Sequence, residues 1–281
     1  MAAGGFAKSR HGLRPRKKLG QHFLRDRTVI QTILAKAGFG SDSHVLEVGA
    51  GLGALTLPLA RSVGRVYAVE KDGRLVERLE AALRREAVPN VSLIHRDILK
   101  LELAELPVPS AQKLGVIGNL PYNISTPLLE RLITNRARFS RAVLMFQHEV
   151  GCRMIASPGS REYGSLSVLI QYHARVSPLL QVSREAFYPR PEVNAMVLSI
   201  DFENPYPRRA EDEENFKKVV RAAFAHRRKT LLNSFRGSAC AFPGEVLLQA
   251  LRGCGIDPGR RAETLHIDDF LCLSAHLKCL P

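Results

Sequence analysis

The sequence predicts an α/β fold followed by a small all-α domain, and three observations support this. Between residue 26 and about residue 200, short runs rich in Val, Ile and Leu alternate with segments of helical spacing, which is typical of βαβ units. These runs are almost continuously apolar, as expected of parallel strands that are buried on both faces. After a proline-rich linker at 204–209 such runs stop, and only helical spacing continues.

The predicted elements follow one another in a regular order. The strands are expected at His44–Val48, Arg65–Val69, Val91–His95, Leu114–Gly118 and Ala142–Gln147. The helices around them are expected at Val29–Ala37, Leu55–Arg61, Leu75–Arg85 and Thr126–Asn135. Two further segments, Ala174–Val182 and Val193–Phe202, have no strong helix between them, so we expect an antiparallel hairpin that closes the sheet.

The remaining chain is predicted to form short helices. They are expected at Glu211–His226, Arg228–Arg236, Glu245–Arg252 and Asp268–Leu277. We therefore divide the chain into a basic N-terminal arm (1–25), a sheet domain (26–204) and a C-terminal helical domain (205–281).

The charge of the chain indicates a polyanionic partner. Lys and Arg number 41 against 27 Asp and Glu, a net charge of +14, which suits nucleic acid or an anionic membrane surface. The first 25 residues hold seven basic side chains and no acid. This arm could be a solvated tail, a phosphate-binding segment or, less well because it has little Ser, an organelle transit peptide.

The sequence gives no sign of a membrane span or a signal peptide, so a cytoplasmic location is expected. The five cysteines are an odd number without a CxxC pair. We therefore expect reduced thiols and no metal site.

A glycine-rich turn follows the first predicted strand, in the segment Glu47-Val-Gly49-Ala-Gly51-Leu-Gly53. Glycines at this place let the backbone approach a ligand, and the next helix offers free N–H groups. Glu70, at the end of the second strand, suits ribose hydroxyls in either a nicotinamide or an S-adenosylmethionine site. Glu47 suits a cationic amino group, and Asp97 suits an adenine amino group. These two acids favour S-adenosylmethionine, with a nicotinamide or flavin cofactor and a turn without a ligand as alternatives.

The fourth predicted strand ends in Asn119-Leu120-Pro121-Tyr122. The exocyclic nitrogen of adenine is a poor nucleophile because its lone pair is delocalised into the ring. The Asn119 amide oxygen and the Leu120 carbonyl could accept both of its N–H hydrogens and direct the lone pair toward a methyl sulfonium. Pro121 would stiffen the turn, and Tyr122 would offer a ring for stacking. The alternative is a loop with a core tyrosine.

In these motifs the chain resembles the rRNA adenine N6-dimethyltransferases. The resemblance covers nearly the whole chain. Its segments are LGQHFL at 19–24, EVGAGLGALT at 47–56, NLPYNISTP at 119–127, FQHEVGCR at 146–153, YGSLSV at 163–168, FYPRPEV at 187–193, RRKTLLN at 227–233 and GIDP at 255–258. His148 stands where Lys is commoner in the family.

The resemblance implies a Rossmann-like class I S-adenosylmethionine-dependent methyltransferase domain with a helical C-terminal domain. It implies N6,N6-dimethylation of two adjacent adenosines in the 3′-terminal hairpin of small-subunit (16S) rRNA during ribosome biogenesis, with the immature small subunit as partner. Phe187 would hold the target base against Tyr122. The implied cofactor contacts are His22, Leu24, Gly49, Glu70, Asp97 and Asn119.

Other interpretations stay open. One is a large-subunit (23S) rRNA methyltransferase of the antibiotic-resistance type, and another is a binding factor in ribosome assembly. An NAD oxidoreductase is a weaker alternative because no hydride-transfer site is visible. Candidate phosphate contacts are the basic arm, Arg131, Arg136, Arg138, Arg141 and Arg227–Lys229. A monomer is the simplest expectation for the oligomeric state.

Overall fold

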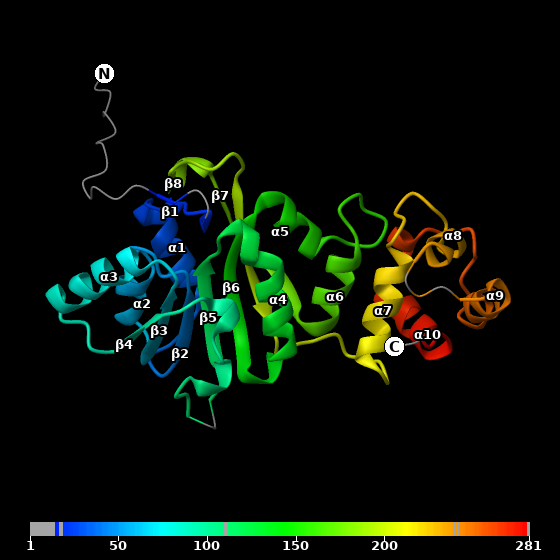
Figure 1. Cartoon of the computed structure of the whole chain (residues 1–281), viewed down its shortest axis with the longest axis horizontal. Helices are drawn as coiled ribbons and strands as arrows, with labels where there is room; N and C mark the ends of the chain where they lie inside the picture. Colours follow the sequence, from blue (N-terminus) through cyan, green and yellow to red (C-terminus); the bar gives the residue numbers. More distant parts are fainter. Residues whose placement is uncertain (1–14, 17–18, 110–111, 239, 241, 280–281) are drawn as a thin grey trace, which may run out of the picture.

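The computed structural model describes residues 15–16, 19–109, 112–238, 240 and 242–279, with Tyr122 described by its backbone alone. Most of the predicted basic arm, residues 1–14, 17 and 18, thus lies outside the described residues. Figure 1 shows a sheet flanked by helices, with a separate group of helices beside it at the C-terminal end of the chain. Among the described helices, none is long and apolar enough to span a membrane.

The central sheet has seven strands in the order β4-β3-β2-β5-β6-β9-β7. The strands are β2 (His44–Val48), β3 (Arg65–Glu70), β4 (Val91–His95), β5 (Leu114–Asn119), β6 (Phe139–Gln147), β7 (Arg175–Val182) and β9 (Ala195–Asp201). From β4 to β6 every pair is parallel. β9 pairs antiparallel with both β6 and β7, so the predicted closing hairpin is confirmed.

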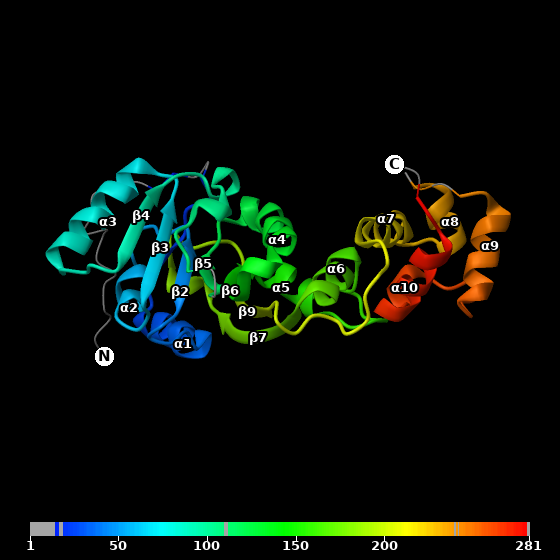
Figure 2. The same ribbon diagram turned by 90° about the horizontal axis from the view of Figure 1, so that it is seen from below.

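Successive residues of each strand point to opposite faces of the sheet, and each face has its own helices. Leu46 and Tyr67 pack with α4 (Ser125–Thr134) and α5 (His148–Ile155). Val45 and Val66 pack on the other face with α1 (Arg27–Ala37), α2 (Thr56–Ala60) and α3 (Gly73–Arg85). The two layers of helices are visible on either side of the sheet in Figure 2. This is the doubly wound Rossmann-like arrangement that the sequence predicts.

Side-chain caps determine where several helices begin. Asp26 accepts hydrogen bonds from the backbone amides of Thr28 and Val29 at the start of α1. Asp72 caps α3 through the amide of Arg74, and Asp212 caps α7 (Glu213–Ala223). Acidic caps satisfy amides that have no partner within the helix.

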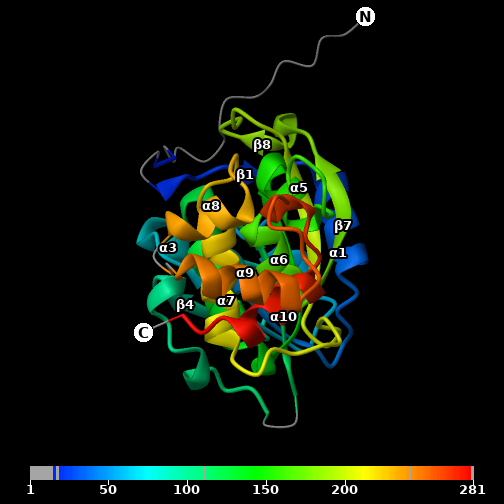
Figure 3. The same ribbon diagram turned by 90° about the vertical axis from the view of Figure 1, so that its right-hand side faces the viewer.

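The helical domain has its own hydrophobic core. Its helices are α7 (Glu213–Ala223), α8 (Leu231–Arg236), α9 (Gly244–Gly253) and α10 (Ile267–His276). Phe216, Phe235 and Phe270 are fully buried among them. Viewed from this end, α7 to α10 lie in front of the sheet domain (Figure 3).

Helix α6 (Ser165–His173) connects the two parts of the molecule. Ile170 packs into a core of the sheet domain, whereas Val168 and Tyr172 pack into the core of the helical domain. Two ion pairs, Arg136 to Glu213 at 2.8 Å and Arg221 to Glu130 at 2.7 Å, also join the parts. These contacts do not test the predicted domain limits at residues 25 and 204, which stay a prediction based on the sequence.

The helices α5 and α6 and the two-stranded sheet formed by β1 (Phe23–Leu24) and β8 (Phe187–Tyr188) were not predicted from the sequence. The expectation that all cysteines are reduced thiols is wrong for one pair, because Cys254 and Cys272 form a disulfide. The fold brings their Cα atoms to 5.8 Å although the residues are 18 apart in the sequence.

Candidate active site

A cleft of about 430 Å³ lies at the carboxyl ends of β2, β3 and β5, close to the two-stranded sheet. Ligands of doubly wound sheets bind at this edge. The residues that line the cleft come from segments 19–25, 47–55, 69–71, 96–98 and 119–124 and also include Leu75 and Tyr188. The predicted site residues among them are His22, Leu24, Gly49, Glu70, Asp97, Asn119 and Pro121.

The glycine turn has a backbone shape that favours glycine. Gly49, Gly51 and Gly53 all have positive φ, at 75°, 59° and 83°. Such angles are strained for residues that carry a Cβ. At Gly49 an added Cβ would lie 3.6 Å from the backbone oxygen of Asn119. The turn thus runs close beside the Asn119 loop, and the two segments form adjoining walls of one cleft.

Glu70 holds the turn in place. Its Oε2 accepts a hydrogen bond from the Gly51 amide at 2.9 Å, and its Oε1 accepts from the Lys71 and Asp72 amides at 2.9 and 2.8 Å. A carboxylate has about four acceptor positions, so one stays available toward the cleft. Glu70 can therefore position the turn and still accept a hydrogen bond from a hydroxyl of the ligand.

Glu47 lines the same cleft as a buried acid with an unused acceptor. Its side chain is 1% exposed, and its Oε2 has no hydrogen-bond partner. Burial raises the pKa of Glu47 to about 8, although Thr56 lowers it, and the neighbouring Glu70 raises it further. A buried acceptor without a partner costs free energy. Its position in the cleft therefore fits a ligand that carries an amino group.

Asp97 is held in a different way. It caps the short helix η2 (Ile98–Lys100) through the Leu99 amide, and Lys71 Nζ lies 2.7 Å from its Oδ2. The Lys71 ammonium lowers the pKa of Asp97 despite partial burial. The carboxylate therefore stays ionised as an acceptor in the cleft wall.

Asn119 is the last residue of β5, and its amide group is oriented by a neighbouring segment. Its Nδ2 donates a hydrogen bond to the backbone oxygen of His22 at 2.8 Å. His22 Nδ1 lies 2.7 Å from the backbone oxygen of Pro189. These contacts connect the segment 19–25, the loop after β5 and the segment after β8. Because Nδ2 is engaged, the Asn119 side chain has one fixed amide orientation.

The other residues of the Asn119 motif lie in different surroundings. Leu120 has a side chain that is 2% exposed and belongs to the core beside α4. Pro121 lines the cleft. Tyr122 begins the short helix η4 (Tyr122–Ile124), and its side chain lies outside the described part of the structure.

Phe187 lies in the core, and its neighbour Tyr188 lines the cleft. Phe187 is 6% exposed and packs in the cluster that contains Leu24 and Val182. Tyr188 is 39% exposed, and the Arg25 guanidinium carbon lies 4.0 Å from the centre of its ring. Tyr188 was not identified from the sequence as a site residue. The two adjacent aromatic residues in FYPRP were a usable signal, because successive residues of a strand point to opposite faces and one of the two could therefore reach the cleft.

Several basic residues expected to contact phosphates have partners within the protein. Arg131 donates to the backbone oxygens of Leu99 and Leu101. Arg136 donates hydrogen bonds to both carboxylate oxygens of Glu213, and Arg227 Nε lies 3.4 Å from Oε2 of Glu263. Arg131 and Arg136 therefore connect elements of the fold.

The sequence matches the model of the ribosomal RNA adenine dimethylase family over residues 12–278. A relative from Geobacter metallireducens, named ribosomal RNA small subunit methyltransferase A, is 45% identical over 271 residues, or 96% of this chain and 98% of the relative. A relative of the same name from Geobacter sulfurreducens is 46% identical over 95% of this chain and 96% of the relative.

Solved structures agree with the fold. A dimethyladenosine transferase from Plasmodium falciparum superposes with a TM-score of 0.75 at 26% identity, covering 89% of this chain and 95% of that one. The 23S rRNA methyltransferase ErmE superposes with a TM-score of 0.68 at 24% identity, covering 91% and 99%; this second likeness concerns the fold alone. The chain belongs to the ribosomal RNA adenine dimethylase family, whose cofactor is S-adenosylmethionine.

Proposed function

We propose that this enzyme dimethylates N6 of two adjacent adenosines in the 3′-terminal hairpin of small-subunit (16S) rRNA. The observation that carries the proposal is the similarity, over nearly the full length, to relatives named ribosomal RNA small subunit methyltransferase A. The net charge of +14 agrees with an RNA substrate.

The cleft residues receive separate roles toward the cofactor. Glu70 accepts from the ribose, and Asp97 accepts from the adenine amino group. The unpartnered Oε2 of Glu47 faces the amino group of the methionine part, directly or through water. His22, Leu24 and Gly49 complete the walls. The cofactor supplies the electrophilic methyl group, and these residues fix its position.

Asn119 and Leu120 act on the target base. The Asn119 amide oxygen and the Leu120 backbone carbonyl accept the two N6–H hydrogens, so that the nitrogen lone pair points toward the methyl group. The hydrogen bond from Asn119 Nδ2 to His22 supports this role, because it directs the amide oxygen away from His22. Methylation makes the nitrogen acidic, so the proton can leave late without a strong base. Orientation and electrostatic stabilisation then provide the catalysis.

The target base has to leave the RNA stack before its N6 can react. Tyr122 and Phe187 are proposed to hold the extruded base, with Pro121 stiffening the loop. Phe187 is buried, so this role requires its neighbours to move when the base enters. Stacking contributes about 1–3 kcal/mol per base, which offsets much of the unstacking.

The same proposal covers the cellular setting. We infer that the protein works in the cytoplasm as a monomer, on the immature small ribosomal subunit, with the basic arm (1–25) contacting phosphates. Removal of residues 1–18 is then expected to weaken RNA binding and to reduce its dependence on salt.

The test is methylation of small-subunit particles that lack the modification. The particles are incubated with the protein and S-adenosylmethionine, and their RNA is digested and analysed by mass spectrometry. The expected product is a pair of N6,N6-dimethyladenosines in the 3′-terminal hairpin. Large-subunit RNA serves as the matched control substrate.

Two other outcomes would change the proposal, the first by refuting its substrate and the second by adding a separate function. Methylation of the large-subunit RNA alone would show that the enzyme is a large-subunit (23S) rRNA methyltransferase. Particle binding and assembly rescue by an Asn119→Ala variant without methylation would show that assembly binding is a function separate from catalysis.

A further inference from the structure

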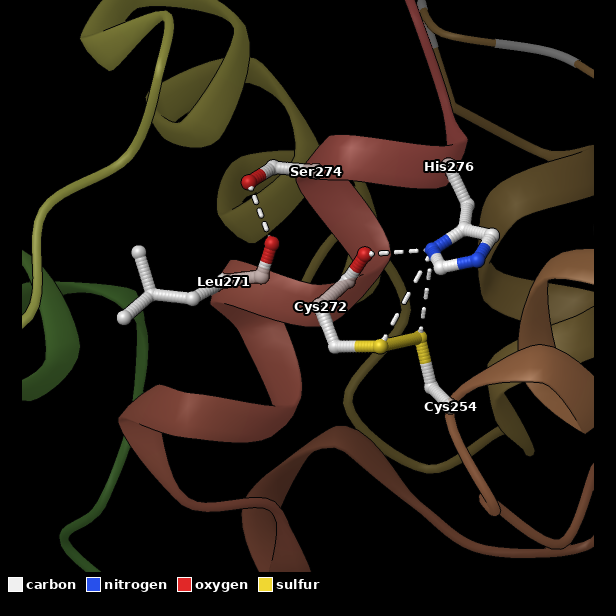
Figure 4. The surroundings of a disulfide bond; sticks show 5 residues. All are labelled: Cys254, Leu271, Cys272, Ser274 and His276. Carbon is white, nitrogen blue, oxygen red and sulfur yellow. Dashed lines mark hydrogen bonds between the residues drawn. A yellow bond between two sulfur atoms is a disulfide. The ribbon is translucent and has the colours of Figure 1, made fainter.

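The helical domain contains a cluster of soft ligand atoms that the methylation site does not use. Cys254, Cys272 and His276 lie together on the outer side of this domain, and Figure 4 shows the imidazole beside the two sulfurs. Their ligand atoms all lie within 4.8 Å of one another. Among the residues that the structure describes, this is the one group of three or more potential metal ligands of this kind.

Local structure places each of the three residues. Cys272 and His276 are four residues apart on α10, so they share one face of the helix. Cys254 directly follows the last residue of α9 as its C-cap, and Gly255, with φ of 67°, turns the chain away after it. The buried Leu271 and Leu273 fix the opposite side of α10 in the core. The cluster therefore connects the end of one helix to the side of another.

The imidazole is oriented toward the sulfurs by its surroundings. His276 Nδ1 lies 3.7 Å from Cys254 Sγ and 3.9 Å from Cys272 Sγ. Its Nε2 faces Gly253, where an added Cβ would lie 3.1 Å away. A structural disulfide does not need a histidine beside it. The imidazole of His276 next to both sulfurs therefore distinguishes this cluster from an ordinary disulfide.

The two sulfur-to-nitrogen distances match those of a tetrahedral zinc site. With Zn–S bonds of 2.3 Å and Zn–N bonds of 2.0–2.1 Å, tetrahedral geometry separates sulfur from nitrogen by about 3.6 Å and the two sulfurs by about 3.8 Å. The two sulfur-to-nitrogen distances are already close to this value. Cleavage of the disulfide would let the sulfurs separate while the nitrogen stays nearly in place.

We propose that Cys254, Cys272 and His276 form a zinc-type metal site when the Cys254–Cys272 disulfide is reduced, with water as the fourth ligand. A dithiol reductant cleaves the S–S bond, passes two electrons and two protons to the cysteines, and becomes a disulfide itself. Zn²⁺ then displaces one proton from each thiol and forms two Zn–S bonds. Nδ1 of neutral His276 forms the Zn–N bond, with the ring proton on Nε2.

The two states exclude each other, because the same sulfur atoms bind either the metal or one another. In the oxidised protein His276 Nδ1 lies 3.0 Å from the backbone oxygen of Cys272, which can accept the ring proton. In the metal-bound protein that proton has moved to Nε2. Either bond joins the end of α9 to α10, so the cluster retains a link between these helices in both states.

The test uses the full chain with Co²⁺ as a spectroscopic probe for zinc. The protein is reduced, freed of metal with a chelator and titrated with Co²⁺ without oxygen. We expect one equivalent to bind with the thiolate-to-cobalt and d–d absorption of a tetrahedral site, and Zn²⁺ to displace it. The same protein with its disulfide intact should give no such absorption, and this comparison needs no variant.

Variants identify the ligands. Cys254→Ser and Cys272→Ser should each abolish the thiolate spectrum of the two-sulfur site, and His276→Ala should weaken Co²⁺ binding about tenfold or more. The matched control is Cys240→Ser with Cys279→Ser, which removes two other cysteines of the helical domain and should leave the spectrum unchanged.

Three results would overturn the proposal. They are no stoichiometric tetrahedral spectrum in the reduced chain, an equal spectrum in the oxidised chain, and full binding by the His276→Ala variant. Circular dichroism of each metal-free variant shows whether it is folded, so that loss of the site is not mistaken for unfolding.

Discussion

Two buried polar side chains, Glu47 in the sheet domain and Asn215 in the helical domain, have opposite hydrogen-bonding environments. Asn215 is 7% exposed. Its Nδ2 donates to the backbone oxygens of Ser274 and Leu277, and its Oδ1 accepts from the Cys279 amide. Glu47 is buried more deeply, yet its Oε2 has no partner.

The difference separates structural polarity from functional polarity. Asn215 uses its hydrogen bonds to fasten the segment 274–279 to α7, so its burial is compensated within the protein. Glu47 lies in the cleft wall, and its unused oxygen reduces the stability of the protein without a ligand. A buried polar group left without a partner at a cleft is a mark of a binding site.

The largest effect is expected from Asn119→Ala at the cleft. This change removes a preoriented acceptor for the N6 hydrogens, so the rate of methyl transfer should fall about 100- to 1000-fold. Cofactor affinity, measured by calorimetry, should change far less. The control is Asn135→Ala, which removes an amide bonded to the Arg131 backbone oxygen outside the cleft. An equal loss of cofactor affinity and turnover would contradict the role of Asn119 in orienting the base.

The variant Glu47→Gln tests how much the buried, unpartnered carboxyl group of Glu47 lowers the stability of the folded protein. The pKa of Glu47 is about 8 in the folded protein and close to 4.5 when unfolded. Between these values the folded state holds a proton that the unfolded state has lost, so stability falls as pH rises, by about 1.4 kcal/mol per pH unit. A glutamine at this position cannot lose a proton when the chain unfolds, so the variant should be more stable than the wild type at pH 7 to 8.

Thermal unfolding of both proteins from pH 4 to pH 8.5 checks this prediction. The difference in stability should shrink toward pH 4.5. Cofactor binding should at the same time be weaker in the variant, because an amide cannot ionise to pair with the amino group of the cofactor. A pH-independent difference in stability would show that Glu47 is not protonated by burial.

Asn215→Ala is expected to affect stability and leave catalysis unchanged. It leaves two backbone oxygens and one amide without their partner, and each such group costs about 1–3 kcal/mol when buried. The free energy of unfolding, from urea titration, should fall by about 3 kcal/mol or more. Asn204→Ala at the surface, whose amide binds Asp201, should change it by less than about 0.5 kcal/mol. Loss of methylation at full stability would contradict the distinction drawn between the two residues.

The sequence predicted the sheet and the glycine turn because period and composition report local structure directly. All five predicted parallel strands are present, and β2 and β4 have the predicted limits. The two-stranded sheet of β1 and β8 could not be predicted, since Phe23 and Tyr188 pair across a separation that no local pattern encodes. The same pairing places Tyr188 at the cleft and Phe187 in the core, which residue type alone does not distinguish.

The cysteines show the same limit. Spacing in the sequence gave no metal motif, because Cys254 lies 18 residues before Cys272, at the C-cap of α9, whereas Cys272 lies on α10. The i, i+4 spacing of Cys272 and His276 was visible in the sequence, but a third ligand is contributed only by the packing of α9 against α10. Partners of a side chain on its own helix can thus be predicted, and partners from other elements require the fold.

The smallest effect is expected from Asn90→Ala, which tests whether the difference between Glu47 and Asn215 depends on the domain or on the site. Asn90 belongs to the sheet domain, but its Nδ2 donates to the backbone oxygens of Ala60 and Val63, away from the cleft. Because the side chain is half-buried, water can replace part of these bonds. The free energy of unfolding should fall by about 1 kcal/mol, with unchanged methylation and no new pH dependence. If Asn90→Ala instead impaired cofactor binding as strongly as Glu47→Gln, polar residues throughout the sheet domain would affect the site. The unpartnered oxygen of Glu47 would then no longer distinguish the cleft from the scaffold around it.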